Sequence, residues 1–445
     1  MRSPTRVTPP EFVLAGCRLI DGVSDAPREN HYVEVRHGKV VSAGPVARAP
    51  KDKGVHRYDC QGRTVMPGLI DCHVHMVYAG AKNMEEAMRF PVEAAVINAV
   101  VHARAILNAG FTAVREVGTI GNTSVAMRDA VAARKIYGPK VVASGRGIGT
   151  TGSGNDVLPP HWESTAGRLV VDGVDAIRKA VRRQTREGVD NVKFIASGGE
   201  FHPTNYTWMT TISEDELRAG IEEAKRWGKT VAVHAQSYDS VKFALRAGAD
   251  TIEHGTRLDE ESIDLFRKSK AYLVPTLCTL YSVLNLGEKL GLSKKQRDEM
   301  KVNQPLWEAS IREAHRAGVQ IASGGDLGNR MPHGDNAVEL EYLATLGIPA
   351  MEVLKAATSV AARAIGRGDR FGAVKPGLEA DLLVVDGDPL ADLRVLQEES
   401  RLNMVFQDGE MVAGTEWKAP HDETESVRPP REEAAAAPAC EAHQH

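Results

Sequence analysis

Cysteines are few and a long apolar run is lacking, and each absence excludes a class of protein. The five cysteines are odd in number and scattered, so a disulfide framework is not expected; without a Cys-x-x-Cys pair, neither is a thiolate zinc site. No run approaches the ~20 apolar residues of a membrane span, and the start, MRSPTRVTPPEF, lacks the apolar segment of a signal peptide. We therefore expect a soluble, cytoplasmic protein.

A dominant charge is lacking as well. The formal net charge is −4, and both signs are interspersed along the 445 residues. Neither nucleic acid nor an anionic membrane surface is therefore an expected partner. The partner that we expect is a small-molecule substrate, for the reasons given below. The length suffices for one large domain and a smaller one.

Three regions and a tail differ in their residue pattern. Short alternating segments with turn glycines fill residues 12–65 and return in residues 368–416, so we expect these stretches to pair into one small β-sandwich. Between them, over residues 66–367, apolar runs alternate with helical patterns, which is typical of parallel βα units. Residues 418–445 are charged, rich in proline and alanine, and aperiodic, so a disordered tail is expected.

The middle region holds eight apolar runs that predict strands. In chain order they are TVMPGLIDCHVH, FTAVREVG, KVVASGRGI, NVKFIASGG, TVAVHAQS, DTIEHG, AYLVPTL and VQIASGGDLG. Eight such βα units fit a (β/α)8 TIM barrel, whose functional residues lie at the C-terminal strand ends. One intervening helix is marked by an S-x-x-E capping box at Ser213 and Glu216. We therefore predict an α/β fold: a TIM barrel with a flanking β-sandwich.

Six residues able to bind a metal lie within or at the ends of these runs. Buried polar or charged side chains need partners, because burying them alone is costly. Alternate side chains share a strand face, so His73 and His75 can project together. A shared metal centre would satisfy the whole set, which is His73, His75, Lys193, His234, His254 and Asp326.

Lys193 and Asp326 suggest the chemistry of that centre. Between Val192 and Phe194, desolvation should lower the pKa of Lys193, and a neutral amine can react with CO2 to give a carbamate that bridges two divalent cations. The alternative is an ion pair with Glu116 or Asp326. Asp326 can bind a metal and accept a proton from water whose pKa the metal lowers toward ~7. These ligands suit zinc, and manganese, cobalt and iron remain open.

The ordered segments resemble the amidohydrolase superfamily, in particular its prolidase-like and imidazolonepropionase-like branch. The resemblance extends from GCRLIDG through VMPGLIDCHVH, VKFIASGG, VAVHAQ, IEHG and SGGDLG to GLEADLLVVDGDP. It implies a binuclear centre and a homo-oligomer. It also implies that Asp326 is the general base, which then protonates the leaving nitrogen. By this resemblance His73, His75 and Asp326 hold one metal, His234 and His254 hold the other, and carboxylated Lys193 bridges them.

Two positions depart from the prolidase-like pattern. Where those members carry TGGHG and HAYT, whose histidine and tyrosine grip a substrate carboxylate, this chain has TGSGND and HAQS, with Gly154 and Gln236. The departure favours neutral amides, ureas or carbamates, as in the phenylurea hydrolases of this branch. The alternatives are an Xaa-Pro dipeptidase or carboxypeptidase, an ochratoxin-type N-acyl amino acid amidase and, remotely, a non-catalytic barrel anchored by metal. A mononuclear deaminase is disfavoured, because such an enzyme would carry a glutamate shortly after the position of His234, where this chain has Gln236.

Several loop residues are candidate substrate contacts. The segment GGEFHPTNYTWMTT is rich in aromatic residues and could act as a lid, or it could be a solvated connection whose aromatics pack on the rim. Glu116, where the family commonly has aspartate, is expected to pair with a neighbouring arginine and not to be catalytic. The candidate contacts are His202, Tyr206, Trp208, Gln236 and His333.

Overall fold

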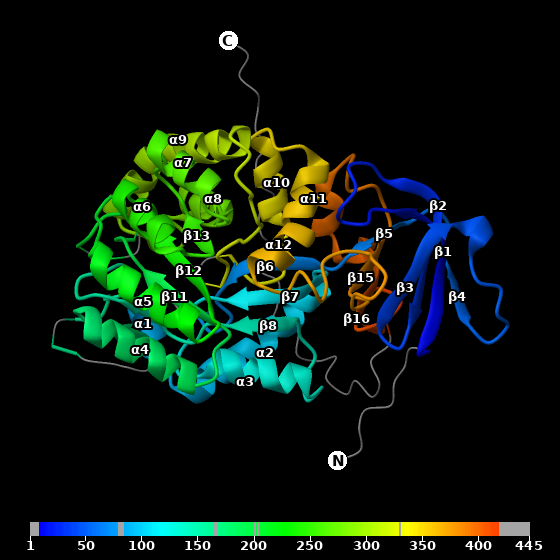
Figure 1. Cartoon of the computed structure of the whole chain (residues 1–445), viewed down its shortest axis with the longest axis horizontal. Coiled ribbons are helices and arrows are strands. Elements are labelled where there is room, and N and C mark those ends of the chain that lie inside the picture. Colours follow the sequence, from blue (N-terminus) through cyan, green and yellow to red (C-terminus); the bar gives the residue numbers. More distant parts are fainter. Residues whose placement is uncertain are drawn as a thin grey trace, which may run out of the picture.

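A unit of parallel strands and helices lies beside a mixed β-sheet in the computed structural model (Figure 1). The structure describes residues 9–78, 84–159, 161–162, 167–199, 202, 204–328 and 331–417. The tail predicted over residues 418–445, and residues 200, 201 and 203 of the predicted lid, lie outside the described residues. None of the described helices combines the length and apolar character that a membrane crossing requires.

The N- and C-terminal segments meet in one mixed sheet. β15 pairs antiparallel with β5, with Leu382 opposite Pro67, and the strand order is β17-β16-β15-β5-β1-β2-β3, with β4 against β1. The predicted pairing of the two ends is therefore present, whereas a two-layered sandwich stays a prediction. The strands are β1 (Glu11–Leu19), β2 (Arg28–Arg36), β3 (Lys39–Pro45), β4 (His56–Asp59), β5 (Thr64–Pro67), β15 (Leu382–Val385), β16 (Leu402–Gln407) and β17 (Glu410–Ala413).

The middle region contains two sheets in which every strand pair is parallel. One has the order β6-β7-β8 and the other β10-β9-β11-β12-β13-β14. Their buried residues are mostly apolar, as expected for strands covered on both faces. The strands are β6 (Leu69–Val74), β7 (Phe111–Glu116), β8 (Lys140–Ala143), β9 (Gly147–Gly149), β10 (Arg168–Val170), β11 (Asn191–Ile195), β12 (Thr230–Ala235), β13 (Thr251–His254) and β14 (Tyr272–Val274).

The eighth predicted run links the two ends of this parallel series. It forms isolated parallel bridges, from Ile321 to Leu273 of β14 and from Leu327 to Val74 of β6. On the other side, the Asp190 N–H donates to the Ala143 carbonyl over 2.8 Å, next to β8 and β11. Backbone contacts thus follow the predicted order of all eight runs.

The first predicted run is divided between the two units. Its start forms β5 in the mixed sheet, and its end forms β6 in the parallel series. The break falls at Gly68, where an added Cβ would lie 2.1 Å from Thr112 Oγ1, so only glycine allows this close passage. Residues 66 and 67, which the sequence analysis places in the barrel, pair in the mixed sheet, and β6 begins at Leu69.

Helices alternate with the parallel strands and cover them on the outside (Figure 1). The predicted capping box is present, with Ser213 and Glu216 bonding each other's backbone at the start of α5. The helices are α1 (Met84–Met88), α2 (Val92–Asn108), α3 (Thr123–Ala132), α4 (Val174–Arg186), α5 (Glu214–Arg226), α6 (Tyr238–Ala247), α7 (Glu260–Lys268), α8 (Leu277–Leu286), α9 (Lys294–Arg316), α10 (Val338–Thr345), α11 (Ala350–Ala356) and α12 (Ser359–Ala364).

Candidate metal centre

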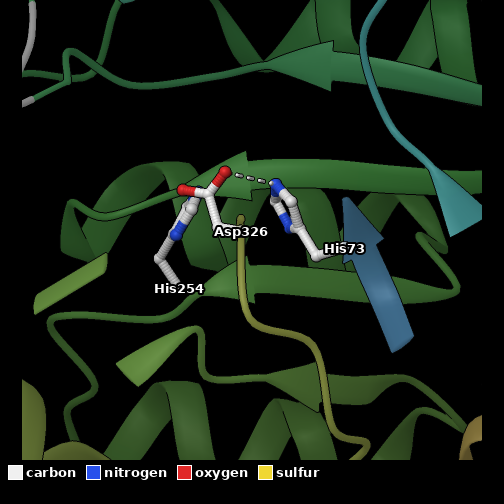
Figure 2. Close-up of side chains that lie close together, drawn as sticks. All are labelled: His73, His254 and Asp326. Carbon is white, nitrogen blue, oxygen red and sulfur yellow. Dashed lines mark ion pairs between the residues drawn. The ribbon is translucent and has the colours of Figure 1, made fainter. Parts of the chain in front are cut away.

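The predicted ligands converge at the carboxyl ends of the parallel strands. Donor atoms of His73, His254 and Asp326 lie within 4.8 Å of one another, and all three side chains point into one space (Figure 2). Asp326 Oδ1 is 3.5 Å from His73 Nε2 and 3.2 Å from His75 Nε2. The ring centroids of His234 and His254 are 4.5 Å apart. The geometry therefore brings these histidines and the aspartate together, while their role as ligands stays a prediction.

Left-handed backbone makes this convergence possible at two positions. His254 has φ 71° and Asp326 has φ 55°, values that are rare for residues other than glycine. In a regular strand, adjacent side chains face opposite sides. At the end of β13 the unusual backbone instead allows both Glu253 and His254 to contact the cluster containing His73. Such strain is typical of sites where the surrounding structure holds a functional geometry.

Glu253 fixes the orientation of His73. The buried Glu253 carboxylate lies 2.7 Å from His73 Nδ1. An ionised carboxylate can only accept, so Nδ1 carries the hydrogen and Nε2 keeps its lone pair for a metal. Burial alone would raise the pKa of Glu253, but the positive charges of Arg115 and Lys193 outweigh it and hold that pKa well below its usual range.

The other three histidines are oriented by acceptors in the same way. His75 Nδ1 is 3.0 Å from the Gly118 carbonyl, and His234 Nε2 is 3.0 Å from the Gly198 carbonyl. His254 Nδ1 is 2.7 Å from Thr276 Oγ1, which donates its own hydrogen to the Pro275 carbonyl. In the neutral rings the lone pairs therefore remain on Nε2 of His75, Nδ1 of His234 and Nε2 of His254. Burial alone would lower the pKa of His75, but Asp326 and Glu116 outweigh it and raise that pKa to about 9, so His75 Nε2 must give up a proton to bind a metal.

Lys193 is buried, and among the described residues its Nζ has no hydrogen-bond partner. Its side chain is 2 % exposed, and within the described ranges neither Glu116 nor Asp326 pairs with its Nζ. The ion-pair alternative is therefore not observed there. Burial lowers the pKa of Lys193 to about 8, partly opposed by Glu253. About a tenth of the amine is thus neutral at pH 7, and the neutral form is the one that carbamate formation requires.

Asp326 keeps one oxygen directed at the histidines. Thr279 donates to Oδ2 over 2.7 Å, while Oδ1 faces His73 and His75. Burial alone would raise the pKa of Asp326, but His73, His75 and His254 outweigh it and hold the carboxyl well below its usual pKa. The donor set thus combines imidazole lone pairs, an ionised carboxylate and an unpartnered amine. These residues fit a centre of divalent cations with nitrogen and oxygen ligands.

Several supporting residues were missed by the sequence reasoning. Arg115 Nη2 pairs with Glu253 over 2.7 Å with both side chains fully buried, and Asp71 Oδ1 accepts from the backbone of His73 and Gly325. A signal existed for each. Asp71 alternates with His73 along β6, and charges of opposite sign stand in the apolar runs FTAVREVG and TIEHG.

The prediction that Glu116 pairs with a neighbouring arginine is wrong for the described residues. Arg115, its neighbour in sequence, pairs with Glu253 instead. Glu116 Oε2 accepts from the Met76 N–H over 2.7 Å, and Oε1 lies 3.7 Å from His75 Nδ1. Glu116 therefore supports the segment that carries His75.

Two candidate substrate contacts are already bonded within the protein. His202 Nε2 lies 2.7 Å from the Asp156 carbonyl, and its Nδ1 accepts from the backbone of Thr204 and Asn205. Gln236 is fully buried, and its Oε1 accepts from Thr256 over 3.3 Å. Both engage loop segments, and their contact with a substrate stays a prediction.

The remaining candidates lie at different depths. His333 is buried, with Nε2 3.1 Å from the His75 carbonyl. Tyr206 and Trp208 are stacked with ring centroids 6.0 Å apart, and Lys295 Nζ lies 3.9 Å from the Tyr206 centroid. Trp208 is 56 % exposed. The Tyr206 ring thus packs on Lys295 of α9 while Trp208 presents its ring to solvent, and a lid stays a prediction.

Comparisons with known proteins agree on one family. The family model described as the amidohydrolase family matches residues 64–412. A prolidase solved with N-methylphosphonate-L-proline is 32% identical with a TM-score of 0.84, covering 91% of this chain and 100% of that one. The ochratoxinase of Aspergillus niger is 28% identical over 434 residues, covering 91% of this chain and 86% of the relative.

A phenylurea hydrolase B structure is similar in fold alone. It has a TM-score of 0.76 and 22% identity, covering 90% of this chain and 96% of that one. The family, in general, uses divalent metal ions and includes hydrolases of carbon–nitrogen bonds. The match spans most of the chain and includes every residue of the cluster above, and on that ground the protein belongs to the amidohydrolase family.

Proposed function

We propose that the chain is a binuclear metal-dependent hydrolase that cleaves a carbon–nitrogen bond in a small amide, urea or carbamate. The observation that carries this proposal is the convergence of His73, His254 and Asp326 within 4.8 Å, together with the buried amine of Lys193, which has no hydrogen-bond partner in the described part of the chain. Hydrogen bonds that fix each histidine tautomer support it, because they leave lone pairs available to metals.

The proposed framework is a closed (β/α)8 barrel with a flanking β-sandwich, and the two bridges of the eighth run support closure. Two divalent cations, best matched by zinc, would be held by the six predicted ligands, with Lys193 carboxylated. When bound, these ions would polarise the scissile carbonyl and acidify water. The homo-oligomer and the cytoplasmic location stay predictions, and light scattering tests the first.

The chain's own residues perform the proton transfers in this proposal. Asp326 Oδ1 accepts a proton from the attacking water and passes it to the leaving nitrogen. Thr279 holds Oδ2, so the carboxylate cannot rotate away from His73 and His75 without losing that bond. Glu253 and Thr276 keep His73 and His254 in the required tautomers.

Two substrate classes are compatible with this chemistry. Neutral amides and ureas are favoured by the loss of carboxylate-gripping side chains at Gly154 and Gln236. Amides that carry a carboxylate are favoured by the similarity to a prolidase and an ochratoxinase, which exceeds that to the phenylurea hydrolase.

The test is a substrate panel on metal-loaded protein and on Asp326→Asn. The panel pairs N-acyl prolines and N-acyl phenylalanines with aryl ureas and anilides. We expect turnover of at least one class, loss of that turnover on chelation, and a loss of about 10²-fold or more in Asp326→Asn with metal retained. Asp298→Asn, at an exposed position on α9, is the control. Near-normal turnover by metal-loaded Asp326→Asn would refute the proton-transfer role.

A further inference from the structure

Tyr78 places a buried hydroxyl beside the metal centre. The side chain is fully buried, and its hydroxyl finds no partner in the part of the chain that the structure describes. Its ring centroid lies 5.3 Å from that of His75, and its hydroxyl would be 3.9 Å from a Cβ built on Gly118. A buried hydroxyl is costly unless it is bonded, so an acceptor from a ligand is the expected partner.

Arg168 brings a positive charge to the same place. Its guanidinium carbon lies 5.7 Å from the Tyr78 ring centroid. Arg168 begins β10, which pairs in parallel with β9 and precedes α4.

We propose that Tyr78 and Arg168 form a carboxylate-binding subsite beside the metal centre, so that the substrate is an amide of an amino acid with a free carboxylate. This inference rests on the proposed function and selects one of its two substrate classes. A phenol hydroxyl and a guanidinium are donors that together match a carboxylate, and a charged acceptor strengthens both hydrogen bonds.

The subsite would also take the place of the histidine and tyrosine that hold the substrate carboxylate in prolidase-like members. A Cβ on Gly154 would lie 3.1 Å from both the Gly199 nitrogen and the Ser197 oxygen, so backbone occupies the place of a side chain there. Gln236 bonds to Thr256. Tyr78, in the loop after β6, and Arg168, the first residue of β10, would supply donors in place of those two positions.

The test compares a non-hydrolysable ligand with and without its carboxylate. N-methylphosphonate-L-proline and the matching prolinamide are titrated calorimetrically into metal-loaded full-length protein, and the ratio of their dissociation constants is measured. We expect the wild type to bind the ligand with the carboxylate about tenfold or more tightly than the prolinamide. In Tyr78→Phe and in Arg168→Met this ratio of dissociation constants should fall most of the way to one. Arg168→Lys should keep part of it.

The protein offers a matched control pair. Arg104 lies over Tyr137 at 5.6 Å, almost the same geometry, but that pair packs against Trp417. Tyr137→Phe and Arg104→Met should keep the wild-type ratio, and metal content and melting temperature verify that all variants fold.

An unchanged ratio in Tyr78→Phe and Arg168→Met, no preference in the wild type, or no binding of either ligand would overturn the subsite. Absence of turnover on the whole panel would instead refute the proposed function, since the ratio is measured without turnover.

Discussion

Replacing Glu253 with glutamine tests how the protein holds its metal centre. The Glu253 carboxylate accepts from His73 Nδ1 and Arg115 Nη2, each over 2.7 Å, and also from Thr251. Glutamine has nearly the same shape but only one acceptor oxygen and no charge. The substitution therefore leaves Arg115 as a fully buried cation without its counter-charge.

The expected loss has two parts. Removing one partner of a buried ion pair costs about 3–5 kcal/mol of unfolding free energy, because the remaining charge stays desolvated. Losing the carboxylate that orients a metal-ligating histidine typically weakens metal binding by about 10–100-fold. For Glu253→Gln we expect both, with the weaker metal binding traced to a less firmly oriented His73.

The loss of stability should also depend on pH. The folded-state pKa of Glu253 lies well below its usual value, so its stabilisation is present above the unfolded pKa of about 4.3 and is lost as pH falls through the window below it. Glu253→Gln lacks this titration. The gap in unfolding free energy between wild type and variant should therefore be full at pH 7 and shrink below about pH 4.

Denaturant unfolding of the metal-free proteins at several pH values measures the gap, and competition with a zinc chelator measures metal affinity. Glu313→Gln is the control, since Glu313 pairs with Arg316 on the surface of α9 and should change stability by less than about 1 kcal/mol. Wild-type stability and metal affinity in Glu253→Gln would refute the reasoning.

Three further substitutions probe the interface between the two units, the bridging lysine and the close packing at Gly154. Lys140 Nζ bonds Glu379, Asp381 and Asp408 at 2.7–2.8 Å, so Lys140→Met should cost about 3–5 kcal/mol in denaturant unfolding. Burial, partly offset by Lys140, raises the pKa of Asp381 to about 6. The contribution of Asp381 to the unfolding free energy therefore falls as pH rises from about 4 to 6. Without Lys140 the pKa of Asp381 should be higher still, so this fall should continue to higher pH, and the stability lost in Lys140→Met should be larger at pH 8 than at pH 5. An equal loss at the two pH values would contradict this. Lys193→Met should reduce the metal content below two ions per chain by elemental analysis, and two ions retained would exclude a bridging lysine. Gly154→Ala should destabilise by about 1–3 kcal/mol, because backbone of residues 197–199 lies 3.1–3.2 Å from the new Cβ, and an unchanged melting curve would contradict that packing.

The split of the first apolar run illustrates where local reasoning ends. Alternation and turn chemistry identified the run, but the assignment of residues 64–67 to the mixed sheet depends on pairing with β15, more than 300 residues further along the chain. The sequence also contains Arg115 and Glu253 in two separate runs, and nothing local states that they meet, since they are 138 residues apart.

The sequence by itself determined which residues lie in apolar runs, where the α5 capping box stands, and which side chains could bind a metal, because strand alternation and helix capping act over a few residues. Tertiary structure decided the rest. It set the tautomer of each histidine through acceptors such as Glu253, which lies 180 residues from His73, and it placed Tyr78 beside Arg168. These depend on contacts between distant strands and loops, which residue order alone does not specify.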